Sequence, residues 1–236
     1  MKLITFASFK GGAGKSTALM ATAGSLAAQG KKLALFEADE NEPLKAWREN
    51  GFEQGTWDEN CRIFHATDLA TFEKAYETAE IDGFDIALTD TQGGGSELNN
   101  TIILSSDLVV IPTALTQIDL DAALNSYEYV VEVFEENNGV AADVPAAILL
   151  QRHPTGRLSV AEKAALDVLQ SLPQFEVKMH ARNAFADIKA IGMLHLYTEK
   201  LAQNPMKRIS SNHMRTAAAE AKALADDLLA SLMEAA

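Results

Sequence analysis

The chain has 236 residues, of which 47% are hydrophobic and 22% charged, so it is an ordinary globular sequence and not a disordered, collagen-like or low-complexity one. Its single cysteine, Cys61, excludes an intramolecular disulfide and any cysteine-rich metal or iron–sulfur site built within one chain. A net charge of −13 argues against a protein that coats nucleic acid generally.

Short apolar runs alternate with helical patterns along the whole chain. The runs predict strands at 2–8, 32–38, 62–66, 84–89, 108–112 and 144–151. The intervening segments predict helices at 16–29, 44–50, 69–81, 97–106, 119–136 and 160–172; after a short run at 175–179 come further helical stretches, the last from about 206 to the end. Suitable capping residues precede three of the helices, at Thr67 or Asp68, Ser96 and Ser159.

This alternation predicts an α/β fold with a mostly parallel, twisted sheet and helices on both faces. No linker rich in Pro, Gly or Ser divides the chain, and no internal repeat is visible. We therefore expect a single domain over residues 1–236.

A glycine-rich loop, FKGGAGKST at residues 9–17, lies between the first expected strand and the first expected helix. Glycines let several backbone N–H groups point at one anion, and the start of the helix adds its dipole. In such a phosphate-binding loop Lys15 would reach the β- and γ-phosphates, Ser16 would bind Mg²⁺ and Thr17 would lie near the α-phosphate. The expected nucleotide contacts are Gly11, Gly12, Ala13, Gly14, Lys15, Ser16 and Thr17. The alternative is an ordinary tight loop with two solvated lysines.

The loop departs from the usual pattern G-x-x-x-x-G-K-[ST], because Phe9 occupies the position of the first glycine. It matches the deviant form K-G-G-x-G-K-[ST]-T, and the sequence resembles the ParA/MinD family of ATPases over nearly the whole chain. The resemblance implies a P-loop NTPase fold, ATP and Mg²⁺ as ligands, and a homodimer that forms when ATP binds. It also implies that Lys10 is the signature lysine, a cation that reaches across the dimer to the partner's phosphates.

Three acidic residues lie at the end of the second expected strand, in EADEN at residues 37–41. The family usually has D-x-D-P-Q there. Asp39 matches the second acid, which the resemblance implies orients the attacking water and helps to hold Mg²⁺ through water. Glu37 stands at the first acid and lengthens that side chain. The alternative for Asp39 is a turn or capping residue at the end of a strand.

The run FDIALTD at residues 84–90 ends in an acid, as a strand that leads to a metal site does. Asp90 would bind a water of the Mg²⁺ shell, since Mg²⁺ keeps several of its waters. The next residues, TQGGG at 91–95, would form a switch segment whose backbone N–H groups, that of Gly93 among them, sense the γ-phosphate. A plain flexible turn is the alternative. At residues 151–154, where the family often contacts adenine, a surface loop is at least as good an interpretation.

Within the family, four stretches resemble the ATPases encoded in virulence C operons of bacterial T-DNA transfer systems. They are SFKGGAGKSTALM, LFEADENEPLKAWREN, GGGSELNNTII and GMLHL. This resemblance implies work on plasmid-type DNA, either recruiting a transfer complex to its site or partitioning it. It also implies a partner protein that is bound to the DNA or to the transfer complex.

The charge is unevenly distributed along the chain. Residues 1–150 contain 9 Lys and Arg against 24 Asp and Glu, whereas the basic segment, residues 151–222, contains 11 against 6. ParA-type proteins bind DNA nonspecifically through basic residues in this half of the ATP-bound dimer, and salt screens remote acidic charges beyond ~10 Å. The expected DNA contacts are Arg182, Lys207, Arg208 and Arg215. No helix-turn-helix or zinc motif predicts base reading, and a solvated charged surface is the alternative.

Membrane attachment is not expected. MinD relatives end in a short basic helix that binds membranes, but the last 14 residues here contain three acidic residues and no basic one, so anionic lipid would repel them. The apolar stretch at the N-terminus is too short for a signal peptide, and no 18-residue apolar run predicts a transmembrane helix. We therefore expect a cytoplasmic protein.

Together these features and the family resemblance imply a Mg²⁺-ATP-dependent, dimerising switch ATPase that partitions, recruits or positions plasmid or transfer DNA. Its hydrolysis would be slow and stimulated by a partner. The first alternative is a positioning switch that acts on a protein partner without binding DNA. The second is a metabolic enzyme on the same scaffold, such as a biotin-pathway ligase, but such enzymes lack the lysine of the K-G-G motif.

Overall fold

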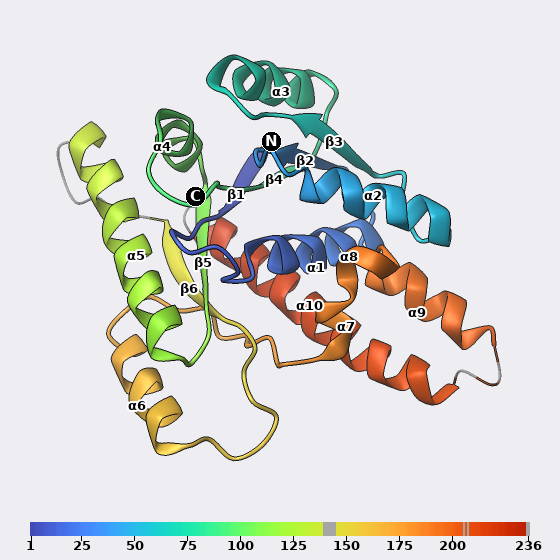
Figure 1. The fold of residues 1–236 in the computed structure, drawn as a ribbon. Coiled ribbons are helices and arrows are strands. Elements are labelled where there is room, and N and C mark those ends of the chain that lie inside the picture. Colours follow the sequence, from blue (N-terminus) through green and yellow to red (C-terminus); the bar gives the residue numbers. More distant parts are fainter. Residues whose placement is uncertain (139–144, 205, 207, 235–236) are drawn as a thin grey trace.

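The computed structural model describes residues 1–138, 145–204, 206 and 208–234, with the side chains of 138, 208–210 and 234 excepted. Within this part, six strands form one sheet in the order β3-β2-β4-β1-β5-β6, and each neighbouring pair is parallel. The strands are β1 (Lys2–Phe6), β2 (Leu33–Glu37), β3 (Cys61–His65), β4 (Ile86–Asp90), β5 (Leu108–Thr113) and β6 (Ala146–Leu150). Helices cover both faces of the sheet (Figure 1), which confirms the predicted arrangement.

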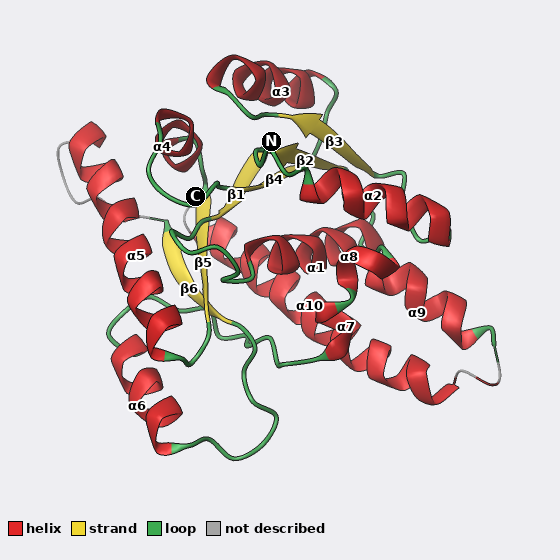
Figure 2. Ribbon diagram, in the orientation of Figure 1, coloured by secondary structure: helices red, strands yellow, loops and turns green. Residues whose placement is uncertain are grey.

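The helices follow the strands in alternation as far as α6, and a group of helices ends the chain (Figure 2). They are α1 (Lys15–Ala28), α2 (Pro43–Gln54), α3 (Leu69–Ile81), α4 (Glu97–Leu104), α5 (Gln117–Asn138), α6 (Val160–Leu169), α7 (Asn183–Ala186), α8 (Ile188–Ile191), α9 (Leu194–Ala202) and α10 (Arg208–Glu234). The second helix is longer than the predicted 44–50, because Pro43 suits its first turn and Gly55 ends it in a left-handed conformation. No helix in the described residues is long and apolar enough to span a membrane.

Side chains of each strand alternate between the two faces of the sheet. Ile4 and Phe6 of β1 pack in a core with α1, α10 and the short helices before α10. Leu3 faces the other way, into a core with α3 and α4. Val109 and Ile111 of β5 pack on that same side against α5 and α6. Both faces are therefore buried along the central strands, which explains why β2, β4 and β5 are largely apolar runs in the sequence.

Three of the predicted capping residues cap their helices. Asp68, Ser96 and Ser159 each accept a hydrogen bond from the backbone N–H three residues later, at 2.9, 3.1 and 3.2 Å. Asp68 rather than Thr67 is the cap of α3. Each such cap stabilises its helix by about 1 kcal/mol.

The carboxyl ends of the central strands lie at one level. The register of β1 against β4 places Phe6 beside Asp90, and that of β2 against β4 places Phe36 beside Thr89. The loops that follow β1, β2 and β4 therefore leave the sheet at the same edge. In open parallel sheets this edge is where ligands bind.

A glycine joins α2 to the helices at the end of the chain. Gly192 has φ 77° and ψ −144°, a conformation that is essentially confined to glycine. A Cβ there would lie 2.3 Å from Oγ1 of Thr56 and 2.9 Å from Cα of Gly51. The Thr56 hydroxyl also donates to the carbonyl of Ile191 at 2.7 Å, and the Thr56 backbone carbonyl accepts from the N–H of Met193 at 2.9 Å. The stretch GMLHL therefore has a packing role.

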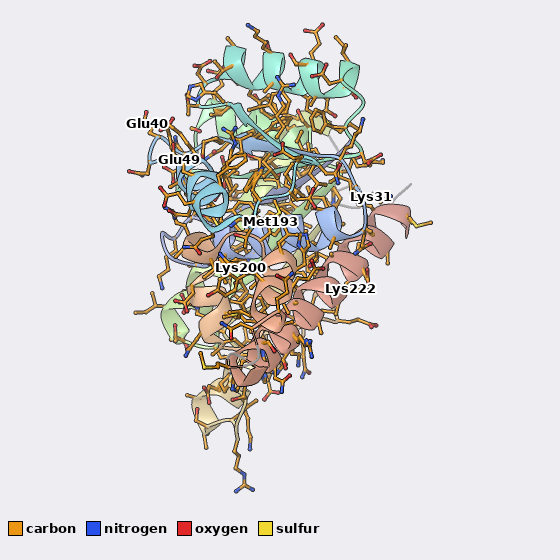
Figure 3. All side chains as sticks on the ribbon, turned by 90° about the vertical axis from the view of Figure 1, so that its right-hand side faces the viewer. Lys31, Glu40, Glu49, Met193, Lys200 and Lys222 are labelled. Carbon is orange, nitrogen blue, oxygen red and sulfur yellow. The ribbon has the colours of Figure 1, made fainter. Side chains whose placement is uncertain are left out.

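Figure 3 shows the side of the molecule that carries α2 and α10, with Lys200 near the middle of the view. Glu40 and Glu49 lie on one side of this view and Lys31 and Lys222 on the other (Figure 3). Met193, between them, is completely buried.

We expect Gly192→Ala to lower the free energy of unfolding by at least about 2 kcal/mol, because alanine would combine a strained backbone with steric overlap. Gly156→Ala is the matched control, since a Cβ at Gly156 meets nothing within 4 Å; its effect should stay within about 0.5 kcal/mol. Urea denaturation followed by circular dichroism measures both. Equal stability of the two variants would contradict the packing role of Gly192.

Candidate nucleotide-binding site

The loop between β1 and α1 depends on glycine at two positions. Gly12 and Gly14 have φ of 81° and 98°, in the left-handed region that favours glycine. A Cβ at Gly14 would also lie 2.7 Å from Oε1 of Gln151, whose Nε2 donates to the Gly14 carbonyl at 3.1 Å. Gly14 is the N-cap of α1, and no side chain among the described residues caps this helix. The first N–H groups of α1 therefore remain available to an anion.

The residues predicted to bind nucleotide and metal line one cavity at this edge of the sheet. Its volume is about 320 Å³. It is lined by Gly11, Gly12, Gly14, Lys15, Ser16, Thr17, Asp39, Asp90, Thr91 and Gly93. Ala13 is buried and does not line the cavity, and neither does Lys10. The other predicted residues thus converge from three loops; we call this space the phosphate cavity.

Ser16 and Asp90 form the corner of the phosphate cavity where a divalent cation fits. The Ser16 hydroxyl donates to Oδ2 of Asp90 at 2.6 Å, while Oδ1 of Asp90 is buried and has no hydrogen-bond partner among the described residues. Burial raises the pKa of Asp90, and the Ser16 hydrogen bond and the charge of Lys15 oppose this effect. A carboxylate oxygen without a partner beside a hydroxyl matches the hard oxygen ligands of Mg²⁺, so these residues fit the ion.

Lys15 and Asp39 complete the charged lining. Burial lowers the pKa of Lys15, which the charges of Asp90 and Asp39 oppose. A cation removed from water in this way gains from a polyanionic ligand. Oδ1 of Asp39 accepts hydrogen bonds from the backbone N–H and the side-chain amide of Asn41, at 2.8 and 2.9 Å. Asp39 is therefore both a turn residue and part of the cavity wall.

Glu37 caps α2 from the end of β2. Its Oε2 accepts from the N–H groups of Leu44 and Lys45 at 2.7 and 3.1 Å, whereas the N-cap residue Glu42 makes no side-chain cap. Burial raises the pKa of Glu37 to about 7, against the effect of the two backbone hydrogen bonds. Glutamate thus stands where the ParA/MinD family usually has aspartate, and the Glu37 side chain connects the Asp39 loop to α2.

Asn99, a residue outside the nucleotide-binding and metal-binding motifs of the sequence, binds the switch segment. Asn99 is 2% exposed, and its Nδ2 donates to the carbonyls of Gln92 and Gly94 at 3.0 and 2.7 Å. A Cβ at Gly93 would lie 3.2 Å from the carbonyl oxygen of Phe9, so Gly93 lets the segment pack against the glycine-rich loop. Asn99 lies in the first turn of the capped helix α4, a common place for an asparagine, so the sequence carries no specific signal for this role.

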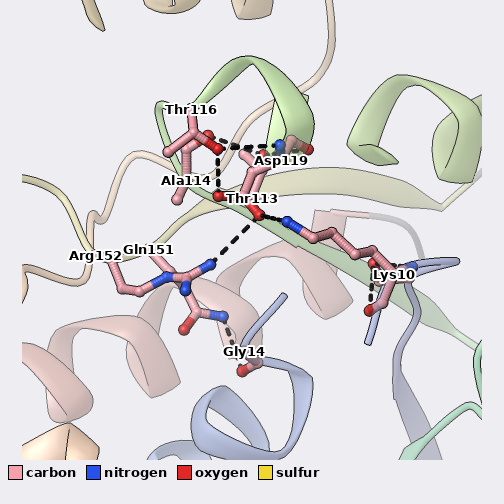
Figure 4. Close-up of polar contacts among 9 residues, drawn as sticks. Lys10, Gly14, Thr113, Ala114, Thr116, Asp119, Gln151 and Arg152 are labelled. Carbon is pink, nitrogen blue, oxygen red and sulfur yellow. Dashed lines mark hydrogen bonds and ion pairs between the residues drawn. The ribbon is translucent and has the colours of Figure 1, made fainter. Parts of the chain in front are cut away.

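Lys10 pairs with an acid outside the phosphate cavity (Figure 4). Its Nζ lies 2.6 Å from Oδ1 of Asp119 near the start of α5, and Nη2 of Arg152 lies 3.6 Å from the same oxygen. Thr116 donates to Oδ2 of Asp119 at 2.7 Å. Burial acts to raise the pKa of Asp119, but the hydrogen bonds from Lys10 and Thr116 and the charge of Arg152 prevail, so the pKa lies below its usual value.

The end of β6 brings two further residues to this edge of the sheet. The N–H of Gln151 donates to the carbonyl of Thr113 at 2.7 Å. Arg152 follows with a φ of 49°, a left-handed conformation that costs a residue other than glycine about 1–2 kcal/mol. Both residues line a second cavity of about 350 Å³. The two cavities share Gly12, Gly14 and Thr17.

The four residues predicted to contact DNA do not form one described patch. Arg182 is paired with Glu220 of α10, with its Nε 2.9 Å from Oε1, and it lines the second cavity. Arg215 is exposed on α10. Lys207 and the side chain of Arg208 lie outside the described residues.

Solved structures share this architecture. The ATP complex of a variant of McdA from Cyanothece matches with a TM-score of 0.69 and 13% identity, over 97% of this chain and 96% of that chain. MinD from Pyrococcus horikoshii OT3, complexed with Mg-ADP, matches with a TM-score of 0.63 and 16% identity, over 96% and 95%. The fold is that of the ParA/MinD P-loop NTPases, as the sequence predicted.

Sequence comparison finds much closer relatives. Protein virC1 of Rhizobium rhizogenes is 50% identical over 220 residues, which cover 93% of this chain and 94% of that protein. Protein virC1 of Rhizobium radiobacter is 47% identical over 235 residues, which cover 100% of both. The family model described as VirC1 protein matches residues 1–235. The chain therefore belongs to the VirC1 family of ParA-like proteins.

Proposed function

We propose that this chain is a single ATPase domain over residues 1–236 that binds ATP with Mg²⁺, closes as a homodimer and reopens after slow, partner-stimulated hydrolysis. In the cytoplasm it partitions, recruits or positions plasmid or transfer DNA. The observation that carries the proposal is the convergence of Lys15, Ser16, Asp39 and Asp90 on one cavity beside the uncapped start of α1. The ATP of the McdA complex and the Mg-ADP of the MinD complex support it.

Each part of the phosphate cavity has a role in this proposal. Lys15 and the first N–H groups of α1 hold the phosphates. Ser16 and Asp90 hold Mg²⁺, which supplies charge neutralisation at the β- and γ-phosphates when bound. Asp39 positions the attacking water, and the N–H of Gly93 senses the γ-phosphate. The second cavity shares lining residues with the phosphate cavity, and its volume of about 350 Å³ has room for the adenine base of ATP.

The position of Lys10 supports a dimer in which each chain serves the nucleotide of the other. Lys10 is 35% exposed and lies outside the phosphate cavity of its own chain. A cation in such a place can be supplied in trans, where negative charge concentrates. Two chains would then close over their cavities, with each Lys10 on the phosphates of the other chain.

We propose that the closed dimer presents the basic segment to DNA without sequence preference. The contacts are Lys207, Arg208 and Arg215, with Arg182 as a weaker one. The second candidate is a switch that acts on a protein partner without binding DNA. It gains support from the pairing of Arg152 and Arg182 with acids of the same chain, which reduces the free positive charge. In either case a partner protein, bound to the DNA or to the transfer complex, stimulates hydrolysis.

Lys15→Ala should raise the dissociation constant for fluorescently labelled ATP by about 10- to 100-fold, since a charge-assisted hydrogen bond contributes roughly 1.5–3 kcal/mol. Lys163→Ala removes an exposed lysine of α6 and is the matched control. Titration in the presence of Mg²⁺ measures both affinities. An unchanged affinity in Lys15→Ala would count against the phosphate cavity.

Lys10→Ala should remain monomeric with ATP, because the dimer loses a cation between its two nucleotides. Multi-angle light scattering with Mg-ATP is the measurement. Asp39→Ala lacks the side chain that positions the attacking water, so it should hydrolyse ATP slowly and provide a second sample that stays loaded with ATP. The unmodified chain is expected to be a dimer with Mg-ATP and a monomer without nucleotide. If the unmodified chain stays monomeric when loaded with ATP, the dimer proposal fails.

Fluorescence anisotropy with a random DNA duplex separates the two candidate functions. We expect binding with Mg-ATP that Lys10→Ala abolishes, and none with Mg-ADP or without nucleotide. Arg215→Ala should reduce the slope of log affinity against log salt by about 0.9, the value for one phosphate contact. Lys31→Ala, outside the basic segment, is the control. Absence of binding in every state would favour the protein-partner switch.

A further inference from the structure

The buried carboxylate of Asp119 is shared by two cations, Lys10 and Arg152. Asp119 is 6% exposed, and its Oδ1 lies within hydrogen-bond distance of Lys10 but beyond that distance from Arg152. Lys10 approaches from the glycine-rich loop and Arg152 from the end of β6 (Figure 4). In the part of the chain that the structure describes, no third cation forms an ion pair with Asp119.

The proposed dimer removes the nearer of these two cations. One ammonium group cannot contact Asp119 and the phosphates of another chain at the same time, so Lys10 leaves Asp119 when the dimer closes. Asp119 itself is fixed, since Thr116 donates to its Oδ2 at 2.7 Å and Thr113 donates to its backbone carbonyl at 3.1 Å. A buried carboxylate that loses its cation is strongly unfavourable. Dimer closure therefore calls for a replacement cation.

Arg152 is placed to supply it. Its side chain is 51% exposed, and a shift of about 1 Å would shorten the 3.6 Å separation to that of a charge-assisted hydrogen bond. Its backbone is anchored, because the preceding Gln151 bonds to the carbonyls of Thr113 and Gly14 at 2.7 and 3.1 Å. The left-handed conformation of Arg152 persists within this anchored turn, where a strained residue is retained only if its surroundings hold it.

We infer that Arg152 is a positioning residue of the switch: it replaces Lys10 on Asp119 when Lys10 moves to the phosphates of the other chain. The exchange removes the electrostatic penalty of closing the dimer. This inference rests on the proposed function and adds to it the means by which Lys10 is released. In this role Arg152 acts through Asp119 and not on the nucleotide.

A double-mutant cycle on dimerisation tests the exchange. Analytical ultracentrifugation with saturating Mg-AMPPNP gives the dimer dissociation constants of the unmodified chain, Arg152→Gln, Asp119→Asn and the double variant. Arg152→Gln should raise the constant about tenfold or more, because Asp119 is left unpaired in the dimer. Asp119→Asn should change it little, because the Lys10 ion pair that closure breaks and the Arg152 ion pair that closure makes are both absent. The double variant should match Asp119→Asn alone, a coupling expected only of residues that act on each other.

Two further variants keep the test independent of misfolding. Arg152→Lys retains the charge and should recover most of the loss seen in Arg152→Gln. Arg157→Gln removes an exposed arginine of the same loop, for which the described residues provide no ion pair, and should leave the dissociation constant unchanged. Thermal melting confirms that each variant is folded.

The outcomes separate this inference from the function on which it rests. If Arg152→Gln weakens the dimer equally in the Asp119→Asn background, Arg152 acts directly on nucleotide or on the other chain, and the exchange is wrong. An unchanged constant in Arg152→Gln also overturns it. The proposed function fails differently: Lys10→Ala would then dimerise normally, or the unmodified chain would not dimerise.

Discussion

The carboxyl ends of β1, β2 and β4 finish at one level, and the chemistry of the site depends on that alignment. In β4, Ile86 and Leu88 face the core that contains α1, and Asp90 continues the same alternation toward Ser16. A slip of one residue in the register would turn Asp90 to the opposite face of the sheet. The extensive apolar burial on both faces, which fixes the register, therefore also fixes the distance between an acid and a hydroxyl that are 74 residues apart.

This molecule contains two kinds of buried charge. In the phosphate cavity, Lys15 and Asp90 are desolvated, and one oxygen of Asp90 has no partner among the described residues. These charges are incompletely paired among the described residues, so a ligand that combines a polyanion with a cation would stabilise them. Asp119 is the reverse case, since both its oxygens are engaged. A second cation, Arg152, lies near Asp119, so either Lys10 or Arg152 can pair with its carboxylate.

Local rules explain what could be predicted from the sequence. Ser16 and Asp90 follow from short motifs at the ends of a loop and a strand, and their convergence follows from parallel strand order. Asp119, Gln151 and Asn99 could not be found in this way. The partners of Asp119 and Gln151 in the glycine-rich loop are 109 and 137 residues away, and no local pattern encodes such contacts. Asn99 acts on carbonyl groups only five and seven residues away, but an asparagine in a first helical turn is too common to stand out.

The hydrogen bonds between Glu37 and the start of α2 have a consequence for the intrinsic fluorescence of this protein. Its two tryptophans, Trp47 in α2 and Trp57 just beyond it, have ring centroids 5.0 Å apart. Trp47 is completely buried, in a helix whose first N–H groups are bonded to Glu37, two residues before Asp39. All intrinsic tryptophan fluorescence of the chain therefore comes from one corner, next to the Asp39 loop. Tryptophan fluorescence can thus report on changes in that loop without an added label.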